Sequence, residues 1–264
     1  MRTTDFTETL ALGRIAPAQQ KPGDILGFEL PYLGATDRLL LYGTALIASR
    51  HVVSIRGLQH ILPAQDPFIL AANHASLRES VLVPSLLFLH RGGKRIHFLA
   101  DWNFRIIPGL GLLYQRAGVV TVVRKPARPR LLNVLKALYD RSVPPRAEAR
   151  AHLAAGRSIG IFPEGQVNRH PDQMLRGRHG TARLSLEAGV PVVPMGIRFC
   201  GPAPGRAGSS YAAMEIVIGA PLVPEGPAHE PASLARVRSW HAVIMTEIAR
   251  LSGKAWTDEA RRGR

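Results

Sequence analysis

Apolar positions along the chain follow two spacings, one typical of strands and the other of helices. Short apolar or β-branched runs predict buried strands. We expect these strands at residues 51–57, 68–73, 95–101, 118–124, 158–165, 190–199 and 214–219. Apolar residues spaced three and four apart predict helices between the strands. We expect these helices at residues 37–50, 79–90, 102–115, 130–140, 146–156, 180–189 and 231–253.

Strands that alternate with helices are typical of α/β proteins. The sequence therefore predicts a mixed, largely parallel sheet flanked by helices. We expect residues 1–50 to form an N-terminal arm and a helix, residues 51–253 to form the main domain, and residues 254–264 to form a basic C-terminal tail. Sites in such folds lie in the loops that follow the strands.

The charge balance points to an anionic partner. Lys and Arg number 34 and Asp and Glu 19, which gives a net charge of +15. Such a surface attracts phosphorylated ligands, anionic lipids or nucleic acid. Nucleic acid is disfavoured because aromatic residues make up only 6% and do not interleave with the basic runs. The single cysteine, Cys200, excludes a disulfide framework and fits a reducing, cytoplasmic setting.

One apolar run raises the question of a membrane. The sequence LLLYGTALIAS at residues 39–49 lies between Arg38 and Arg50. It has about half of the ~20 residues that a membrane span needs. Taken alone, the run favours a helix packed in the core over a helix that lies in a bilayer interface. The acidic N-terminal residues also lack the apolar centre of a secretory signal.

The first candidate chemistry lies in AANHASLRES, residues 71–80. Ser76 and Glu79 match a capping box, with Ser76 as the N-cap and the Glu79 carboxylate on its amide. Capping does not explain the polar pair Asn73 and His74. The same carboxylate could hold the His74 imidazole through Nδ1 and leave Nε2 as a base. On these residues alone, both interpretations stay open.

Three further patterns have the residue types of functional sites. GRSIG at 156–160 matches G-x-S-x-G, but a helix precedes Ser158 and a strand follows it, so Ser158 is not expected to be a nucleophile. Arg124 ends a strand within a basic segment, which is either a solvated loop or a phosphate clamp. Glu164 and Gly165 form a turn that either only reverses the chain or binds ligand hydroxyls. Metal-ligand spacings and complete nucleotide-binding motifs are absent from the sequence.

Four blocks between about residues 68 and 199 resemble, in order, those of the glycerophospholipid (lysophosphatidic acid) acyltransferases. NHASLRE resembles the N-H-x4-D block. The resemblance implies that His74 is the catalytic base and that Glu79 stands in place of the usual aspartate. GVVTVVR resembles the second block, which implies a phosphate-binding role for Arg124.

The third and fourth blocks concern the acceptor and the acyl group. FPEGQVN resembles F-P-E-G-T-R-S, which implies acceptor binding by Glu164 and Gly165, with Arg169 as a substitute for the missing arginine. VPVVPMG resembles the block near the acyl site, which is carried here by Val190, Pro191 and Pro194.

The resemblance implies an O-acyltransferase without a cofactor or a metal. The acyl group would move from acyl-CoA or an acyl carrier protein thioester to the free hydroxyl of a lysophosphatidic acid-like acceptor, in phospholipid biosynthesis. The resemblance also favours an interfacial, membrane-docking helix over core packing for residues 37–50. We therefore expect a peripheral or monotopic enzyme on an anionic membrane, at the cytoplasmic face of the inner membrane.

Two alternatives remain. Gln166 and Val167 stand where the family usually has Thr and Arg, so the acceptor could be another lyso-lipid, such as a lyso-ornithine lipid or a lysophospholipid. A different class of function is a non-catalytic basic module that binds membranes or nucleic acid. Such a module predicts salt-sensitive binding and no thioester turnover.

Overall fold

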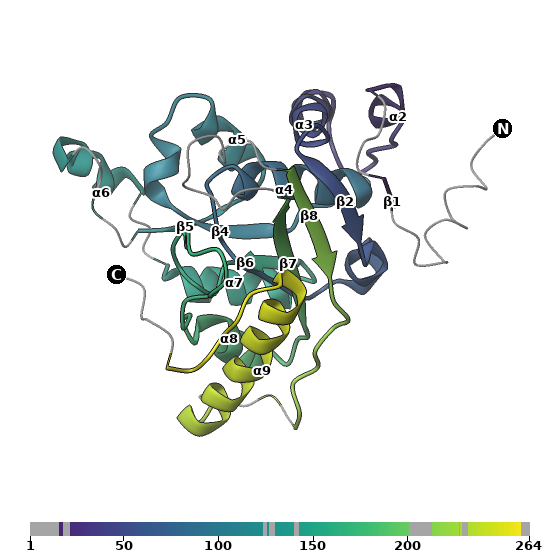
Figure 1. Ribbon diagram of the computed structural model, residues 1–264. Coiled ribbons are helices and arrows are strands. Elements are labelled where there is room, and N and C mark those ends of the chain that lie inside the picture. Colours follow the sequence, from purple (N-terminus) through teal and green to yellow (C-terminus); the bar gives the residue numbers. More distant parts are fainter. Residues whose placement is uncertain are drawn as a thin grey trace.

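The apolar runs of the sequence pair into one sheet with the strand order β1-β2-β8-β7-β3-β6-β4-β5 (Figure 1). The computed structural model describes residues 16–17, 22–123, 126, 130–139, 143–200, 213–226, 228 and 232–259. The strands are β1 Ala16–Pro17, β2 Val52–Arg56, β3 Ile69–Ala72, β4 His97–Asp101, β5 Val120–Val122, β6 Ile159–Ile161, β7 Val192–Cys200 and β8 Ala213–Ile218. The pairs β1–β2 and β7–β8 are antiparallel, and the other neighbouring strands are parallel. The expected mixed, largely parallel sheet is confirmed.

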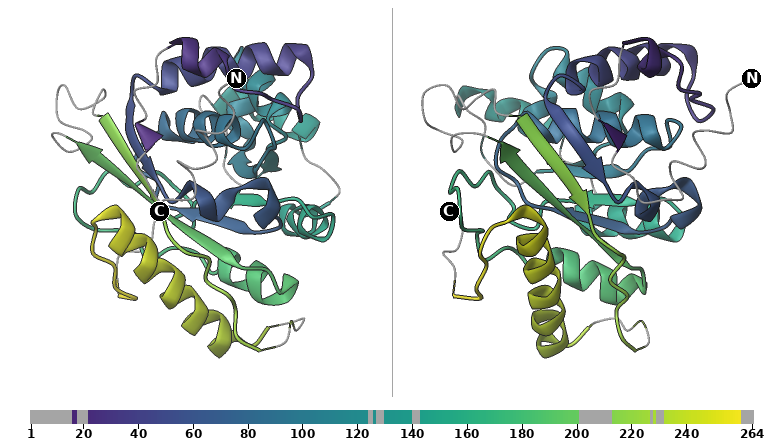
Figure 2. Two further views of the ribbon diagram at one scale, coloured as in Figure 1. Left: turned by 90° about the vertical axis from the view of Figure 1, so that its right-hand side faces the viewer. Right: turned by 45° about the vertical axis from the view of Figure 1, so that its right-hand side comes forward.

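Helices cover both faces of this sheet. The α-helices are α2 Pro22–Leu26, α3 Ala35–Ala48, α4 Glu79–His90, α5 Leu110–Arg116, α6 Lys136–Tyr139, α7 Pro145–Ala154, α8 Gly180–Ala188 and α9 Leu234–Ser252. The 3-10 helices are η1 Leu58–Ile61, η2 Pro63–Gln65, η3 Trp102–Arg105 and η4 Arg130–Leu135. Figures 1 and 2 show α3 and α4 on one side of the sheet and α8 and α9 on the other.

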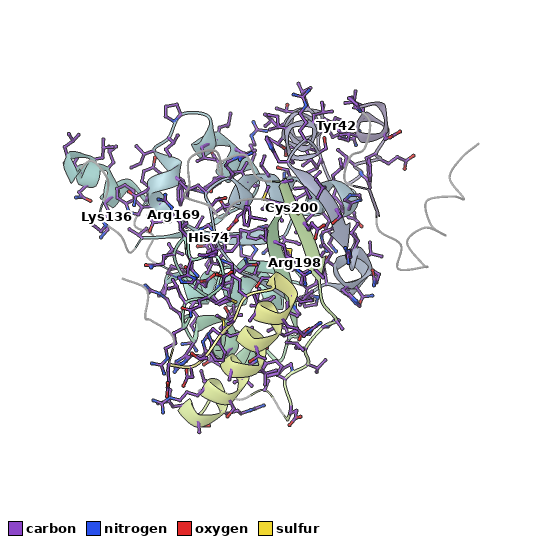
Figure 3. All side chains as sticks on the ribbon, viewed as in Figure 1. Tyr42, His74, Lys136, Arg169, Arg198 and Cys200 are labelled. Atoms are coloured by element: carbon purple, nitrogen blue, oxygen red, sulfur yellow. The ribbon has the colours of Figure 1, made fainter. Side chains whose placement is uncertain are left out.

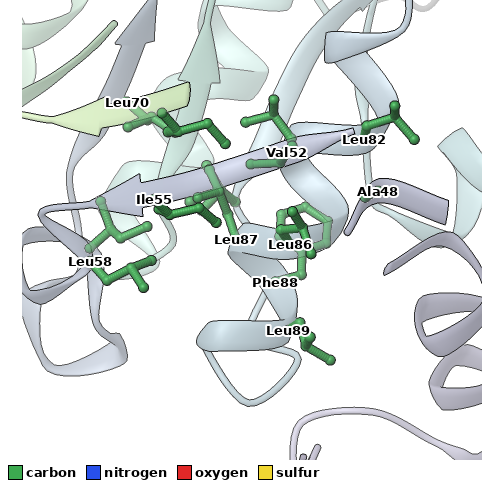
Figure 4. Packing of buried hydrophobic residues seen from close by; sticks show 14 of the residues in the cluster. Ala48, Val52, Ile55, Leu58, Leu70, Leu82, Leu86, Leu87, Phe88 and Leu89 are labelled. Atoms are coloured by element: carbon green, nitrogen blue, oxygen red, sulfur yellow. The ribbon is translucent and has the colours of Figure 1, made fainter. Parts of the chain in front are cut away.

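Strand β3 shows how one sequence serves both layers. Successive side chains of a strand point to opposite faces of the sheet. Leu70 joins the core beneath α3 and α4, part of which Figure 4 shows, whereas Ile69 and Ala71 join the core beneath α8 and α9. All four residues of β3 are buried. The strand is therefore apolar throughout, as a central parallel strand must be.

Helix α3 packs its inner face into this core. Leu41, Ala45 and Ala48 are buried there. Its outer face exposes Leu39, at 73%, and Ile47, at 53%. The core packing that the run alone favoured is thus present on one side of the helix. The interfacial location that the resemblance favoured concerns the other side and stays a prediction.

Some elements differ from the expectation. The helix expected at 102–115 is divided into η3 and α5, and residues 58–65 form two short 3-10 helices that the apolar pattern did not predict. Helix α9 begins after Ser233, whose side chain caps it, and ends at Gly253 in the left-handed conformation. Immediately after that helix, Ala255 pairs with Gln173. The first part of the expected C-terminal tail is therefore integrated into the fold.

Candidate active site

The site begins where β3 ends. The Asn73 side chain donates to Ile197 O at 3.0 Å and accepts from Ile197 N at 2.7 Å, so it continues the pairing with β7 beyond the strand. Asn73 is fully buried, and these two bonds satisfy its amide where apolar residues would leave the β7 backbone groups without partners. The next residue, His74, is fixed at the carboxyl end of the central strand, near the middle of the molecule (Figure 3).

His74 is held to Glu79 through its ring. Its Nδ1 lies 2.8 Å from Glu79 Oε1, and only 12% of its side chain is exposed. The Glu79 side chain is fully buried, and Oε1 also accepts from the Ala75 amide. A carboxylate accepts only, so Nδ1 carries the proton and Nε2 keeps a lone pair. The glutamate thus bridges the distance despite its additional methylene.

The capping box differs from the expectation. Helix α4 starts at Glu79 itself, and Arg78 at the N-cap position has helical backbone angles. The Ser76 hydroxyl accepts only weakly from the Glu79 amide, at 3.5 Å. The Glu79 carboxylate does not lie on the Ser76 amide but on the Ala75 amide and the His74 ring. The S-x-x-E pattern was therefore a misleading guide to the helix start, because the carboxylate has other partners.

The turn after β6 holds the main chain of the same histidine. Glu164 Oε1 accepts from the His74 amide at 3.0 Å. Its Oε2 accepts from the Asn168 side chain at 2.8 Å and from the Leu175 amide at 2.9 Å. Asn168 also donates its own amide to His74 O at 2.7 Å. Glu164 therefore connects the loop after β6 to the loop after β3.

Burial shapes the electrostatics of this turn. Glu164 is 3% exposed, and this burial raises the pKa of its carboxyl group above the ordinary value. The hydrogen bonds from Leu175, His74 and Asn168 act in the opposite direction. The neighbouring Gly165 has φ 69°, and a Cβ added there would lie 2.6 Å from Arg178 Nε. Glycine is required at this position by both the backbone conformation and the close arginine.

An apolar cavity lies beside the histidine. Phe162 stacks on the His74 ring, with centroids 4.4 Å apart, and also lines the cavity. The cavity is open to solvent on one side, and its lining is predominantly apolar. Its walls come from α3, α4, β4 and α5, and include Leu40, Thr44, Val81, Pro84, Phe98 and Leu113.

The other residues expected in the site are dispersed. Arg124 lies outside the described residues. Arg169 is exposed in the loop that follows β6. Val190 and Pro191 lie just before the amino end of β7, whereas His74 follows the carboxyl end of the parallel strand β3, and Pro194 pairs with Ala71 within the sheet. None of these three residues lines the apolar cavity.

Several basic residues of the 91–130 region have structural partners. Arg91 is 1% exposed and donates to both carboxylate oxygens of Asp66, each at 2.8 Å. Arg95 and Arg116 both contact Asp37 of α3, at 2.6 and 3.1 Å. The interpretation of this run as a phosphate clamp therefore does not extend to these three arginines, which join α3 and α4 to the rest of the protein.

Ser158 is excluded as a nucleophile by its surroundings. It is fully buried, between α7 and β6, where its Oγ accepts from the Phe68 amide at 3.1 Å and donates to Asp66. The helix-then-strand context that argued against a nucleophile elbow is confirmed. Within the described residues, no group of three His, Cys, Asp or Glu side chains is placed to hold a metal.

Two contributors were not predicted. Asn168 connects Glu164 to the loop, but an asparagine after a Pro-Glu-Gly turn is ordinary loop composition. Lys254 lies about 90 positions further along the chain and donates to His170 O of the same loop at 2.6 Å. Because the Lys254 contact joins distant segments, no local pattern could have revealed it. In the described part of the chain, no helix combines the length and the apolarity needed to cross a bilayer.

The fold and the paired His74 and Glu79 side chains are consistent with one family. A model of the family described as Acyltransferase matches residues 52–198, which is more than half of the 264 residues. The chain therefore belongs to the acyltransferase family, as the four sequence blocks predicted.

Two similar proteins have names that are more specific than the family description. The chain is 25% identical, over 134 residues, to the 1-acyl-sn-glycerol-3-phosphate acyltransferase of Borreliella burgdorferi, which covers 51% of this chain and 46% of that protein. The match thus spans about half the length of this relative. The crystal structure of the 1-acyl-sn-glycerophosphate (LPA) acyltransferase PlsC from Thermotoga maritima superimposes with a TM-score of 0.51 and 20% identity, covering 97% of this chain and 85% of that chain. This second likeness supports the fold.

Proposed function

We propose that the protein transfers an acyl group from a thioester, acyl-CoA or acyl carrier protein, to the free hydroxyl of a lysophosphatidic acid-like acceptor. The observation that carries the proposal is the His74 ring, which a buried Glu79 holds through Nδ1 beside an apolar cavity. The named activities of the similar proteins from Borreliella burgdorferi and Thermotoga maritima support the same acceptor class.

In the proposed reaction, His74 Nε2 takes the proton of the acceptor hydroxyl as the oxygen attacks the thioester carbonyl. The carbon–sulfur bond then breaks and the thiol leaves with the proton that the imidazole returns. Glu79 accepts from Nδ1–H throughout, which orients the ring and stabilises its charged form. No acyl-enzyme is formed, so the reaction requires no serine or cysteine nucleophile.

We place the acyl chain in the apolar cavity rather than beside Val190, Pro191 and Pro194. The cavity reaches Phe162, which stacks on His74, so a chain within it would bring its carbonyl to the histidine. Its opposite walls include Asp37 and Arg95, which are paired with each other. Charged side chains there oppose further apolar burial and would limit the length of the chain.

Membrane docking is the second part of the proposal. The outer face of α3 presents Leu39 and Ile47 to the surroundings while its inner face lines the cavity. With a net charge of +15, attraction to anionic lipid would add to the apolar contact. The enzyme would thus take lipid substrates at an anionic bilayer surface. Flotation with anionic and with neutral vesicles tests this, and equal recovery in both would contradict the role of charge.

Activity measurements with several different acceptors test the function itself. Thiol release from acyl-CoA is measured with lysophosphatidic acid, other lysophospholipids and a lyso-ornithine lipid. We expect the highest kcat/KM with the phosphate monoester. Turnover only with acceptors that lack a phosphate monoester would contradict the assignment, and Val167, in place of the usual arginine, makes that comparison necessary. Salt-sensitive membrane binding without turnover on any acceptor would instead favour the non-catalytic module.

A further inference from the structure

The segment after α9 returns to the loop that holds His74. Gly253 turns the chain in the left-handed conformation, and Ala255 then pairs with that loop. The Ala255 amide donates to Asp172 O at 2.8 Å, and Ala255 O accepts from the Met174 amide at 2.9 Å. The Trp256 indole adds a bond to Arg176 O at 3.1 Å. Three hydrogen bonds therefore fix residues 255–256 to the loop after β6.

Lys254 is the first residue of this segment. Its Nζ donates to His170 O at 2.6 Å. The His170 amide in turn donates to Asn168 Oδ1, and the Asn168 amide donates to His74 O at 2.7 Å. Lys254 is thus two connected residues away from the candidate base, although 180 positions separate the two in the sequence.

The ammonium group keeps donors for a ligand. A lysine has three N–H donors, and one is used by the His170 carbonyl. Among the described residues, no carboxylate lies within ion-pairing distance of Nζ, so its charge is not neutralised by direct contact. Burial lowers the pKa of Lys254, and the charges of Glu164, Glu79 and Asp172 raise it. These carboxylates include both partners of His74.

The cations of the loop itself differ in their surroundings. Arg176 Nε donates to Asp258 at 3.1 Å, the Arg178 side chain lies against Gly165, and Arg169 is exposed. Position 167, where the resemblance expects an arginine, is valine. The C-terminal segment brings a further cation, Lys254, to this loop and fixes its backbone there.

We infer that Lys254 binds the phosphate of the acceptor and so selects phosphate monoesters among lyso-lipids. The inference rests on the proposed function. A lysine is a suitable point charge for a phosphate, and here its backbone is fixed by the pairing of Ala255 with the loop. The segment expected to be a basic tail then supplies a specificity-determining residue.

The kinetic experiment compares two acceptors that differ by the phosphate. Lys254→Met and Lys254→Gln are tested with lysophosphatidic acid and with monoacylglycerol. Loss of a charged hydrogen bond should raise the KM for lysophosphatidic acid by about tenfold or more, with little change for monoacylglycerol. Glutamine keeps a donor for the His170 carbonyl without the charge, and Lys254→Arg should restore most of the affinity.

Arg250→Met is the matched control. Arg250 lies four positions earlier at the same end of α9 and pairs with Glu247 of its own helix. Removing this charge should leave both KM values unchanged. If the Lys254 variants change both acceptors equally, or if Lys254→Gln behaves as the wild type, the residue only fixes the loop and the inference is wrong. Thermal melting of each variant monitors the fold.

An equilibrium measurement separates this inference from the proposed function. Binding of lysophosphatidic acid in neutral micelles is measured by calorimetry, without an acyl donor. Weaker binding by Lys254→Gln, by about tenfold, with unchanged binding by Arg250→Met supports the inference whatever the turnover. Equal binding by the wild type and Lys254→Gln overturns it. Failure of the wild type to turn over any acceptor contradicts only the proposed function.

Discussion

The first residue of α4 and the loop after β6 each provide a buried glutamate for the same histidine, but the two carboxylates are used differently. Glu79 directs one oxygen at the ring and the Ala75 amide, whereas within the described residues its Oε2 has no hydrogen-bond partner. Glu164 uses both oxygens on three donors from two loops. The first arrangement serves the imidazole, and the second fixes loops. Chemistry and stability should therefore respond separately to the two residues.

The largest effect is expected at the residue that both glutamates hold. His74→Ala removes the proposed base and should lower kcat by about 10²–10⁴-fold or more. The fold should be retained, because the loop contacts of His74 are made by its main chain. The melting temperature should fall modestly, because the buried Glu79 carboxylate loses its ring partner. His60→Ala on η1 is a control that removes a histidine from a different segment. If His74→Ala turned over substrate at the wild-type rate, His74 would not be the catalytic base.

Glu79→Gln tests whether Glu79 serves the His74 imidazole. A neutral amide keeps the size of the side chain but does not stabilise a charged imidazole, so kcat should fall by at least about tenfold. Stability should be preserved, because the substitution neutralises a buried carboxylate that has an unpartnered oxygen. Rate and thermal melting are measured on the same preparations. A large loss of stability at full activity would make Glu79 a structural residue.

Glu164→Gln tests whether Glu164 fixes the loops around His74. The carboxylate accepts three bonds, and an NH2 group in place of one oxygen would face an N–H donor. A buried polar group left without its partner costs about 1–3 kcal/mol. Chemical denaturation should therefore show a loss of stability that Glu79→Gln does not show. Equal stability of the two variants would contradict the proposed division of roles.

The cavity offers a smaller and more selective effect. Thr44→Trp would fill part of the space beneath α3, so competition among thioesters of different length should shift toward shorter acyl chains. Ile47→Trp, on the exposed side of the same helix, is the control. An unchanged preference in Thr44→Trp would argue that the chain lies elsewhere, such as near Pro194.

The smallest effect concerns acid pH and two histidines outside the site, His90 and His152. Burial lowers the pKa of His90 and of His152 to about 4 from an ordinary 6.5. The unfolded chain therefore binds more protons than the folded one, and stability should fall as the pH drops from about 6.5 to 4. His152→Phe should weaken this dependence in melting curves. An identical dependence in the variant would show that other groups dominate.

Local patterns were sufficient for the fold and for part of the site. Period-two and period-3.6 spacing predicted the sheet and its main helices, because burial against a sheet imposes those spacings. His74 and Glu79 are five residues apart, so their contact was within reach of local reasoning. The bonds of Asn73 to Ile197 and of Lys254 to His170 join segments 124 and 84 positions apart. Such contacts depend on strand order, which periodicity does not encode.

The pairing of Ala255 with the loop after β6 also has a consequence for biosynthesis. A ribosome releases the strands and both glutamates well before it reaches this segment. The nascent chain can therefore assemble most of the sheet early, while the loop that carries Asn168 still lacks its last partner. Since a chain folds progressively as it emerges, the candidate site is completed only after residues 254–256 have emerged. A partly made chain would thus be folded before it is competent for its substrate.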